Sequence, residues 1–409
     1  MTTTHTPLRL GILGCANIAK QFARDVRAST SVRLAAVASR DLAKSQAFAQ
    51  SFGITRAHSS YEALLADADI EAIYLPLPNS LHAEWAIRAM QAGKHVLCEK
   101  PLALNHAEVT RMFEVARQQG VMLLEAYPYW FQPQTRDLLA CLQPEKIGEI
   151  RSVHASFGFT VGNVDTNIRM KPDLGGGALL DAGSYPLSLI RLVMGGAPTH
   201  VSAHATWADT GVDISMMATL FYSEGRTAQM SCAMNTANHR RATIVGSHGT
   251  VETEYLNHTS GSHTHAWGYL PSQLRMRQGI ANSIPFEDVH SASGSGFRFA
   301  AEAFAKVVRT QDTAAIERAA AASHDIAATL DAILTSARTG QAVALTGIKK
   351  RQPAKQAGVW RSNRGLRSCR SRGGVCTTQE QTFHLWIGQN FSRRLVQHQA
   401  TGFKRNRIV

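Results

Sequence analysis

The chain has 409 residues, which is long enough for two or three domains, and a formal net charge of +13 at pH 7. Residues 346–409 contain 14 of the 43 lysines and arginines and one of the 30 acidic residues. The remaining 29 basic and 29 acidic residues balance each other in residues 1–345. This distribution argues against nucleic acid as a partner of the patterned part of the chain.

The sequence also argues against a membrane or secreted protein. No apolar run approaches the ~20 residues that span a bilayer, and the polar, Thr-rich start differs from a secretory signal. The six cysteines are scattered and form no Cys-x-x-Cys pair. We therefore expect a cytoplasmic protein with reduced cysteines.

Apolar strands alternate with helical patterns through the first 125 residues. The expected strands are 8–13, 32–38, 70–75, 95–98 and 121–125, and the expected helices lie near 18–26, 60–64, 82–91 and 107–118. Such alternation predicts an α/β domain over residues 1–125, with a doubly wound parallel sheet covered by helices on both faces.

After residue 127, strand-like runs follow one another with little helix between them. The runs cover 151–159, 199–206, 216–222 and 227–233, with a hairpin at 242–255 and one helix at 179–194. Two Ala-rich helices, 297–310 and 317–338, are expected to close this region. The pattern predicts an α+β domain over residues 126–345, built on a large, mostly antiparallel open sheet.

Residues 346–409 lack any sustained apolar period and are rich in Arg, Gln and Ser. Such a composition cannot bury enough apolar surface to offset chain entropy, so we expect disorder. A basic interaction arm and a shifted reading frame are the alternatives.

A glycine turn follows the first expected strand. Residues 11–19 read Gly-Ile-Leu-Gly-Cys-Ala-Asn-Ile-Ala, and their small residues let the backbone approach a pyrophosphate at a helix N-terminus. The expected cofactor contacts in this Rossmann-type turn are Gly11, Gly14, Ala16, Asn17 and Ile18.

The end of the second expected strand indicates which dinucleotide is bound. NAD-binding proteins usually place an acid there, but this chain has Ser39 and Arg40, with Lys44 one turn later. These three side chains would hold the 2′-phosphate of NADP, which is the expected cofactor. NAD is the alternative if the strand ends two residues later, at Asp41.

The segment His-Val-Leu-Cys-Glu-Lys-Pro, residues 95–101, is a short apolar strand that stops at a charged pair. Parallel sheets bind ligands at the carboxyl ends of their strands, so Lys100 is expected to face the cofactor. In the second domain, three glycines at 175–177 precede a helix on which Asp181 and Tyr185 share a face.

These residues suit the oxidation of a secondary alcohol, in which a hydride leaves for nicotinamide while a base takes the hydroxyl proton. A phenol with a pKa of ~10 is too weakly ionised at neutral pH unless a nearby ammonium lowers its pKa. We predict that Tyr185 is the acid/base, that Lys100 supplies the ammonium and that Asp181 orients the pair.

The glycine turn, the Glu-Lys-Pro segment and the Asp-x-Gly-x-Tyr segment resemble, in this order and spacing, the Gfo/Idh/MocA oxidoreductases. The resemblance covers about residues 8–345 and is greatest to the branch of D-xylose dehydrogenases and dimeric dihydrodiol dehydrogenases. It implies a Rossmann domain joined to an open-sheet substrate domain, Lys100 and Tyr185 as the catalytic pair, and dimers formed through the second sheet.

The resemblance also implies a cis peptide before Pro101 and places Asn79 and His82 near the nicotinamide. Pro76, in the turn after the third expected strand, and Glu99, as the anchor of the Lys100 turn, complete the expected cofactor-binding set.

Two substrate-binding residues are expected. Trp130 lies where relatives often carry an Arg, and its ring suits stacking on a sugar or an aromatic diol, with interface packing as the alternative. Arg169 precedes the glycine run. From this position its side chain can either reach the substrate or lie on the protein surface.

The sequence thus predicts an NADP-dependent dehydrogenase that acts on a sugar or polyol hydroxyl, with C1 of D-xylose as the favoured site of oxidation. The protein is expected to form a homodimer or a higher homo-oligomer. Its substrate would be a small-molecule sugar or cyclic diol. The alternatives are a trans-dihydrodiol dehydrogenase and a non-catalytic dinucleotide-binding sensor of the same fold. No metal is expected, because His258, His263 and His265 lie in a Ser/Thr/Gly-rich segment typical of a loop.

Overall fold

The computed structural model describes residues 6–254, 273–292 and 294–345. The three histidines considered as metal ligands and the expected disorder of residues 346–409 therefore lie outside the described residues.

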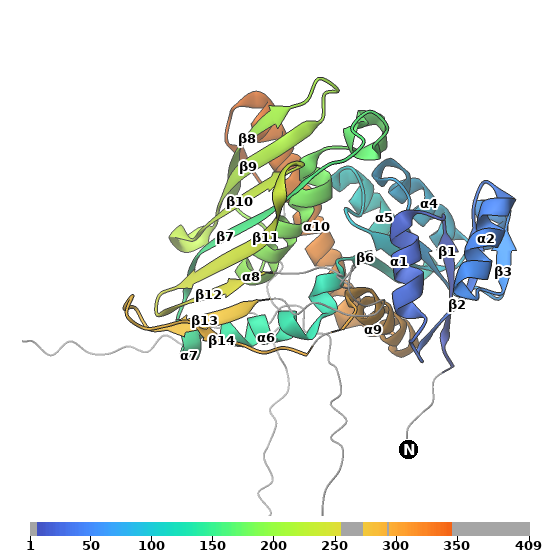
Figure 1. Cartoon of the computed structure of the whole chain (residues 1–409), viewed down its shortest axis with the longest axis horizontal. Helices are drawn as coiled ribbons and strands as arrows, with labels where there is room; N and C mark the ends of the chain where they lie inside the picture. The colour runs from blue at the N-terminus through green and yellow to red at the C-terminus, as the bar shows by residue number, and fades with distance from the viewer. Residues whose placement is uncertain (1–5, 255–272, 293, 346–409) are drawn as a thin grey trace, which may run out of the picture. The chain divides into compact units, whose positions relative to one another are not determined.

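The first sheet has six parallel strands in the order β3-β2-β1-β4-β5-β6 (Figure 1). Its strands are β1 (Leu8–Leu13), β2 (Val32–Ala38), β3 (Arg56–His58), β4 (Ala72–Leu75), β5 (His95–Glu99) and β6 (Leu123–Ala126). Helices connect them on both sides: α1 (Asn17–Val26), α2 (Leu42–Phe52), α3 (Tyr61–Leu65), α4 (His82–Gln91) and α5 (His106–Gln119). The predicted doubly wound parallel sheet is confirmed, and α2 and β3 are additions that the sequence patterns did not indicate.

Local sequence explains where these elements begin and end. β1 buries side chains on both faces, because helices cover both sides of the sheet: Leu10 and Ile12 point to one face and Leu13 to the other, and all three are fully buried. α5 begins at Asn105, whose side chain accepts a hydrogen bond from the backbone of Glu108, and ends at a left-handed glycine.

The second sheet has nine strands in the order β14-β13-β12-β11-β7-β10-β9-β8-β15. They are β7 (Ile150–Thr160), β8 (His200–Trp207), β9 (Asp213–Phe221), β10 (Thr227–Ala233), β11 (Asn235–Gly246), β12 (Gly249–Thr253), β13 (Leu274–Gln278), β14 (Glu287–Asp288) and β15 (Val343–Ala344). β7 and β10 pair in parallel, and the other described pairs are antiparallel. This confirms the predicted mostly antiparallel sheet.

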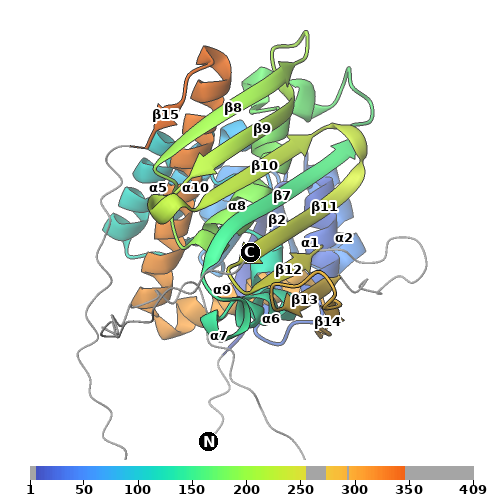
Figure 2. The ribbon, with the colours of Figure 1, turned by 90° about the vertical axis from the view of Figure 1, so that its left-hand side faces the viewer.

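The helices that the structure describes cover one face of the second sheet, and none of them lies on the other face, as Figure 2 shows. The helices after β6 are α6 (Pro133–Cys141), α7 (Pro144–Ile147), α8 (Ser184–Met194), α9 (Gly296–Thr310) and α10 (Thr313–Thr339). Short 3-10 turns lie at 79–81, 128–131, 168–170, 172–174 and 223–225. α8 packs against both β7 and α10, and nearly all of its side chains are buried.

One expectation about the last helices is wrong, because α9 packs on the first sheet's helices and not on the second sheet. The ring of Phe297 lies 5.8 Å from that of Phe22 on α1, and Ser295 donates to Asp25 at 2.7 Å. α10 contacts both regions: Ser323 donates to Glu125 on β6, while other α10 side chains enter the core of the second sheet. Sequence period alone cannot show which surface an amphipathic helix covers.

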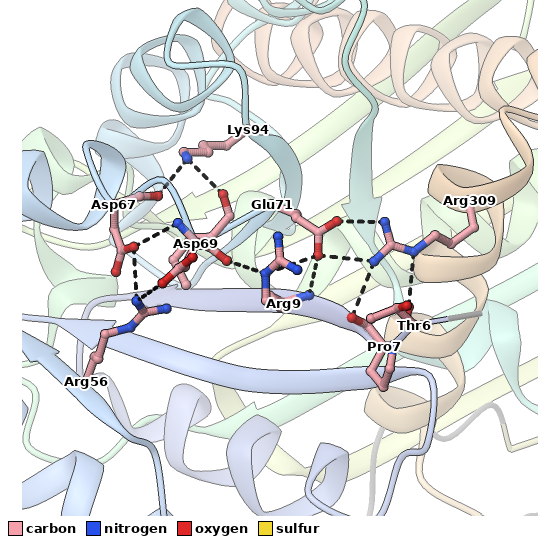
Figure 3. Close-up of polar contacts among 10 residues, drawn as sticks. Thr6, Pro7, Arg9, Arg56, Asp67, Asp69, Glu71, Lys94 and Arg309 are labelled. Carbon is pink, nitrogen blue, oxygen red and sulfur yellow. Dashed lines mark hydrogen bonds and ion pairs between the residues drawn. The ribbon is translucent and has the colours of Figure 1, made fainter. Parts of the chain in front are cut away.

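A polar cluster fixes α9 at the amino edge of the first sheet (Figure 3). Arg309 pairs with both oxygens of Glu71, at 2.7 and 3.1 Å, and Arg9 pairs with the same carboxylate. Lys94 donates to the backbone oxygens of Asp67 and Ile70. Because this edge is closed by structural contacts, the carboxyl edge remains for a site.

Of the helices that the structure describes, none is long and apolar enough to cross a membrane. The cysteines within the described ranges, Cys15, Cys98, Cys141 and Cys232, are free and buried. The cytoplasmic location stays a prediction.

Candidate active site

Lys100 follows the last residue of β5, at the carboxyl edge of the parallel sheet. The peptide between Lys100 and Pro101 is cis, as the family resemblance implied. The Lys100 side chain is nearly buried and points toward the second domain, where it meets the helix that carries Asp181 and Tyr185.

The predicted catalytic residues lie together. The Lys100 ammonium donates to the backbone oxygen of Asp181 at 2.7 Å and to its Oδ1 at 3.1 Å. The same nitrogen lies 4.6 Å from the centre of the Tyr185 ring. Lys100 is therefore fixed between the Asp181 carboxylate and the Tyr185 ring, and proton transfer by Lys100 and Tyr185 stays a prediction.

Asp181 is shared between two cations. Its Oδ2 accepts from Nε of Arg169 at 2.5 Å, while its Oδ1 faces Lys100. Burial opposes the charge of Asp181, but Lys100 and Arg169 outweigh burial and lower its pKa to about 2. Burial likewise opposes the charge of Lys100, but Asp181, Tyr185 and Glu99 raise the pKa of its ammonium. Both groups are ionised at neutral pH.

The helix predicted over 179–194 begins with an unusual turn. Leu179–Gly183 is π-helical, and α8 continues from Ser184. π-Helical turns are rare and are found often at functional sites. This turn carries Asp181 toward Lys100, and Tyr185 follows in the first turn of α8.

Aromatic side chains surround Tyr185. Its ring lies 5.3 Å from Phe157 of β7 and 5.9 Å from Tyr127, and the Trp130 ring is tilted against Tyr127 at 4.8 Å. Trp130 is half-buried and donates to the hydroxyl of Tyr129 at 2.8 Å. Trp130 thus belongs to the aromatic cluster at the site, and its contact with substrate stays a prediction.

The glycine turn has the shape that a dinucleotide requires. Gly14 has φ +115°, and a Cβ there would lie 2.9 Å from Leu77. Ala16 is the N-cap of α1 and gives its helix no side-chain cap, so the first backbone N–H groups, near Asn17 and Ile18, can receive a phosphate. Gly11 is different: it lies within β1, where a Cβ would press on Leu64 and Ile70.

The residues expected at the 2′-phosphate lie directly after β2. The strand ends at Ala38, so Ser39 is at its tip, and Arg40 and Lys44 are exposed. Asp41 is the N-cap of α2 and accepts from the backbone of Lys44. The alternative in which the strand extends to Asp41 is therefore wrong.

The other expected cofactor residues line the turns behind Lys100. His82 is fully buried, with its two ring nitrogens 2.8 Å from the backbone oxygens of Pro101 and Leu77. Glu99 is buried and accepts from the Tyr74 hydroxyl at 2.6 Å. Pro76 is buried directly after β4, and Asn79 donates to the backbone oxygen of Gly175 at 2.8 Å. His82 and Glu99 thus support the Lys100 turn, and cofactor contact by all four residues stays a prediction.

The sequence patterns did not indicate three residues that lie near the site. Asp213 and Glu125 are buried carboxyls that accept from the backbone of Leu179 and Leu102, and Phe159 lies under the guanidinium of Arg169 at 5.5 Å. The alternation in β7 could have indicated Phe159, but no local pattern marks the other two. Among the residues that the structure describes, no three His, Cys, Asp or Glu side chains form a metal-binding group.

Comparison with known families agrees with this geometry. Residues 8–127 match the oxidoreductase family with an NAD-binding Rossmann fold, and residues 135–252 match the GFO/IDH/MocA C-terminal domain. The chain belongs to the Gfo/Idh/MocA family. The resemblance inferred from sequence is confirmed, as is the expectation of a dehydrogenase that uses a nicotinamide dinucleotide.

Two curated relatives cover nearly the whole of this Gfo/Idh/MocA fold. D-xylose 1-dehydrogenase (NADP(+)) 2 of Haloferax volcanii is 35% identical over 339 residues, which are 83% of this chain and 100% of the relative. Trans-1,2-dihydrobenzene-1,2-diol dehydrogenase of Danio rerio is 33% identical over 338 residues, 81% of this chain and 96% of the relative.

A solved structure is also similar. The crystal structure of a 3-ketoreductase from Actinomadura kijaniata in complex with NADP and TDP-benzene has a TM-score of 0.71 and 32% identity. The match covers 81% of this chain and 98% of the reductase.

Proposed function

We propose that this protein is an NADP-dependent dehydrogenase that oxidises a hydroxyl of a sugar or polyol, with C1 of D-xylose as the first substrate to test. The position of the Lys100 ammonium, between Asp181 and the Tyr185 ring at the carboxyl edge of β5, is the observation that carries the proposal. The Haloferax relative, which is named an NADP-dependent D-xylose 1-dehydrogenase, supports the choice of substrate.

The residues present suit NADP. The uncapped start of α1 and the open backbone at Gly14 would hold the pyrophosphate. Exposed Arg40 and Lys44, with the Ser39 hydroxyl, would hold the 2′-phosphate. When bound, the nicotinamide accepts the hydride that leaves the substrate carbon.

The proton chemistry would belong to the chain itself. Tyr185 as phenolate takes the proton of the substrate hydroxyl, so that loss of hydride and proton converts the C1 hydroxyl of a cyclic sugar into a lactone carbonyl. The nearby Lys100 ammonium favours the charged phenolate and donates a hydrogen bond to the reacting oxygen. Asp181 keeps Lys100 protonated and in place. In the reductive direction Tyr185 donates the proton.

Trans-dihydrodiol oxidation is the second candidate, because an aromatic cluster of Tyr127, Tyr129 and Trp130 adjoins Tyr185. A flat cyclic diol would pack against such rings. The Danio rerio relative carries this activity in its name.

The decisive experiment measures the absorbance of reduced nicotinamide after NADP is mixed with a panel of aldoses, polyols and trans-dihydrodiols. We expect turnover with D-xylose, and Tyr185→Phe should lower kcat about 10²- to 10⁴-fold while leaving the Kd for NADP nearly unchanged. Tyr222→Phe, which changes another buried tyrosine, is the control.

The outcomes separate the candidates. Turnover of dihydrodiols alone would select the second candidate. Tight NADP binding with no turnover on the whole panel would favour the dinucleotide sensor. Near-normal activity of Tyr185→Phe would refute the proposed proton path.

The cofactor assignment has its own test. Arg40→Ala should weaken NADP binding about 10- to 100-fold, the effect of losing one charge-assisted contact, and should leave NAD binding almost unchanged. Arg33→Ala, at an exposed position on β2, is the matched control. Equal weakening of NAD and NADP would refute the phosphate contact.

We also propose a homodimer formed through the open face of the second sheet. Met217 is 64% exposed on β9 and lies opposite His204 of β8. Its neighbour Met216 belongs to the buried core, so Met217 lies on the other face of the sheet, where Figure 2 draws no described helix. A sheet face that no described helix covers, and that carries a large exposed apolar side chain, suits a second copy of the same face. Met217→Glu should shift the mass measured by light scattering to that of a monomer, and an unchanged mass would exclude this interface.

A further inference from the structure

A carboxylate from a distant strand holds the start of the catalytic helix. Asp213, the first residue of β9, accepts a hydrogen bond from the backbone N–H of Leu179 at 2.6 Å. Ala178, directly before the π-helical turn, provides no side-chain cap of its own. Asp213 is only 4% exposed and lies 34 residues away from Leu179 in sequence. The cap of this helix is therefore a tertiary contact, which a search for local capping residues does not find.

The glycine run is shaped to receive this carboxylate. Gly177 has φ +113°, and a Cβ at this position would lie 2.2 Å from Oδ1 of Asp213. The backbone N–H of Gly177 donates to the backbone oxygen of Arg169 at 2.9 Å. Any side chain at this glycine would push the carboxylate away from the helix start.

We propose that Asp213 is a positioning residue for the reaction: its carboxylate holds the turn at Leu179 so that Asp181 and Tyr185 meet Lys100. This inference rests on the proposed function, in which Lys100 and Tyr185 transfer the proton. Asp213 contacts the backbone of the turn at Leu179, so it acts on Asp181 and Tyr185 through that backbone.

The connection from Asp213 to the site is short. Its partner Leu179 lies two positions before Asp181, whose backbone oxygen and Oδ1 both bind the Lys100 ammonium. A negative charge at a helix start also interacts favourably with the helix dipole. A π-helical turn departs from the regular bonding of an α-helix, and the contact from Asp213 holds its first residue from outside the helix.

The contact is expected to depend on pH. Burial raises the pKa of Asp213 to about 6, against the opposing hydrogen bond from Leu179. The charged or titratable groups that interact with Asp213 are Arg338 on α10 and Cys232 on β10, and Cys232 in turn interacts with Asp181. Burial raises the pKa of the Cys232 thiol well above its usual range, while the pKa of Asp181 is about 2, so neither changes charge near pH 6.

Protonation of the Asp213 carboxylate should therefore change stability and activity in opposite directions. A raised pKa means that the folded protein binds a proton more tightly than the unfolded chain, so this group alone adds stability as the pH falls toward 4. Turnover requires the carboxylate and should decline as the pH falls through about 6. A fall in kcat without a parallel fall in melting temperature is the expected signature.

The test compares Asp213→Ala, Asp213→Asn and the control Asp209→Asn, which changes an exposed aspartate between β8 and β9. In the full chain with NADP and the best substrate, Asp213→Ala should lower kcat about 100-fold, the loss typical of a catalytic group displaced by 1 Å, with little change in the Kd for NADP. Asp213→Asn keeps an acceptor oxygen, so it should retain more activity and lose the decline near pH 6.

Hydrogen exchange of the peptide 177–187 gives a second measurement that needs no turnover. Exchange in Asp213→Ala should be faster than in the parent and the control, and the parent should show the same change below pH 6 after correction for intrinsic rates. If Asp213→Ala does not fold, Asp213→Asn supplies both measurements.

The outcomes of this test differ from failure of the proposed function. A parent protein without turnover on any substrate would refute the proposed function, and hydrogen exchange would still decide whether Asp213 holds the turn. A parent with turnover, and an Asp213→Ala variant with parental kcat and parental exchange, would overturn the inference. If the kcat of Asp213→Asn still declined as the pH falls through about 6, the assignment of this pH dependence to Asp213 would be overturned.

Discussion

The two edges of the parallel sheet carry the same electrostatic arrangement with different consequences. At the amino edge Glu71 is shared between Arg9 and Arg309, and at the carboxyl edge Asp181 is shared between Lys100 and Arg169. In both networks the cations outweigh burial and lower the pKa of the carboxylate. A carboxylate between two cations therefore does not by itself mark a catalytic site.

The surroundings of each network make the difference. The amino-edge cations bind backbone oxygens of the chain itself, as Arg309 does with Thr6 and Pro7, and so use their donors for structure (Figure 3). At the carboxyl edge, the Lys100 ammonium lies over the ring of a titratable phenol, and the glycine turn after β1 lies at the same edge of the sheet. An ion pair becomes functional when it controls the charge of a group that can react.

The largest expected effect is that of Lys100→Met. It should lower kcat about 10³-fold, because the phenolate of Tyr185 loses its ammonium. It should also lower the free energy of unfolding by about 3 kcal/mol, because Asp181 keeps only the partly exposed Arg169 as a partner. The double variant Lys100→Met/Asp181→Asn should regain stability, measured by urea unfolding, but should not regain turnover, measured as kcat.

Lys94→Met is the matched control, because Lys94 is a buried lysine directly before the same strand, β5. Its ammonium donates to two backbone oxygens at 2.8 Å and meets no reactive group. It should cost stability and leave the kcat of the folded enzyme unchanged. Equal losses of kcat in both variants would remove the distinction between the two edges.

Glu125 extends the comparison to a buried carboxyl that has no cation as a direct partner. It accepts from the backbone of Leu102 and from Ser323, and burial raises its pKa to about 7 despite these bonds. The folded state thus holds a proton that the unfolded chain releases, so stability should fall by about 3 kcal/mol as the pH rises from about 4.5 to 7.

Glu125→Gln should remove that slope while its amide oxygen still accepts from Leu102. Unfolding free energies at several pH values between 5 and 8 measure the difference, and Glu114→Gln on the exposed side of α5 is the control. The same pH slope in Glu125→Gln and the parent would show that another group titrates.

A smaller effect is expected from Arg309→Met at the amino edge. Loss of its two-pronged pair with Glu71 should lower the free energy of unfolding by about 1–2 kcal/mol, since both side chains are partly exposed. The kcat of the folded enzyme should stay at the parental value, with exposed Arg111→Met on α5 as the control. Reduced turnover in a fully folded Arg309→Met would mean that the amino edge is coupled to the site.

The sequence predicted those parts of the molecule that local patterns determine. The boundaries of β1, β2, α4 and β5 agree with the prediction to within a residue, because their apolar runs and caps are local. The three-residue β3 and the two-residue β15 have no run long enough to detect. The parallel pairing of β7 with β10 and the packing of α9 on α1 depend on contacts between distant residues.

The site shows the same division. Lys100, Asp181 and Tyr185 could be found because a strand end and a glycine run mark their positions, and the structure brings all three together. Asp213 and Glu125 could not be found, because each bonds to backbone N–H groups that only the folded chain places beside it. A side chain that holds a backbone turn from another strand has no sequence pattern of its own.

The smallest expected effect is that of deleting residues 346–409. β15 completes the edge of the second sheet, and the backbone N–H of Leu345 donates to Thr199 at 2.9 Å, so the deletion removes no strand of either described sheet. The Haloferax relative is matched over its whole length by 83% of this chain. The melting temperature, kcat and Kd for NADP should equal those of the full chain, whereas binding to an anionic resin should fall, because 14 basic residues and one acidic residue are lost. Weaker NADP binding after deletion would assign the basic segment a role at the site and reduce the contrast between the two sheet edges.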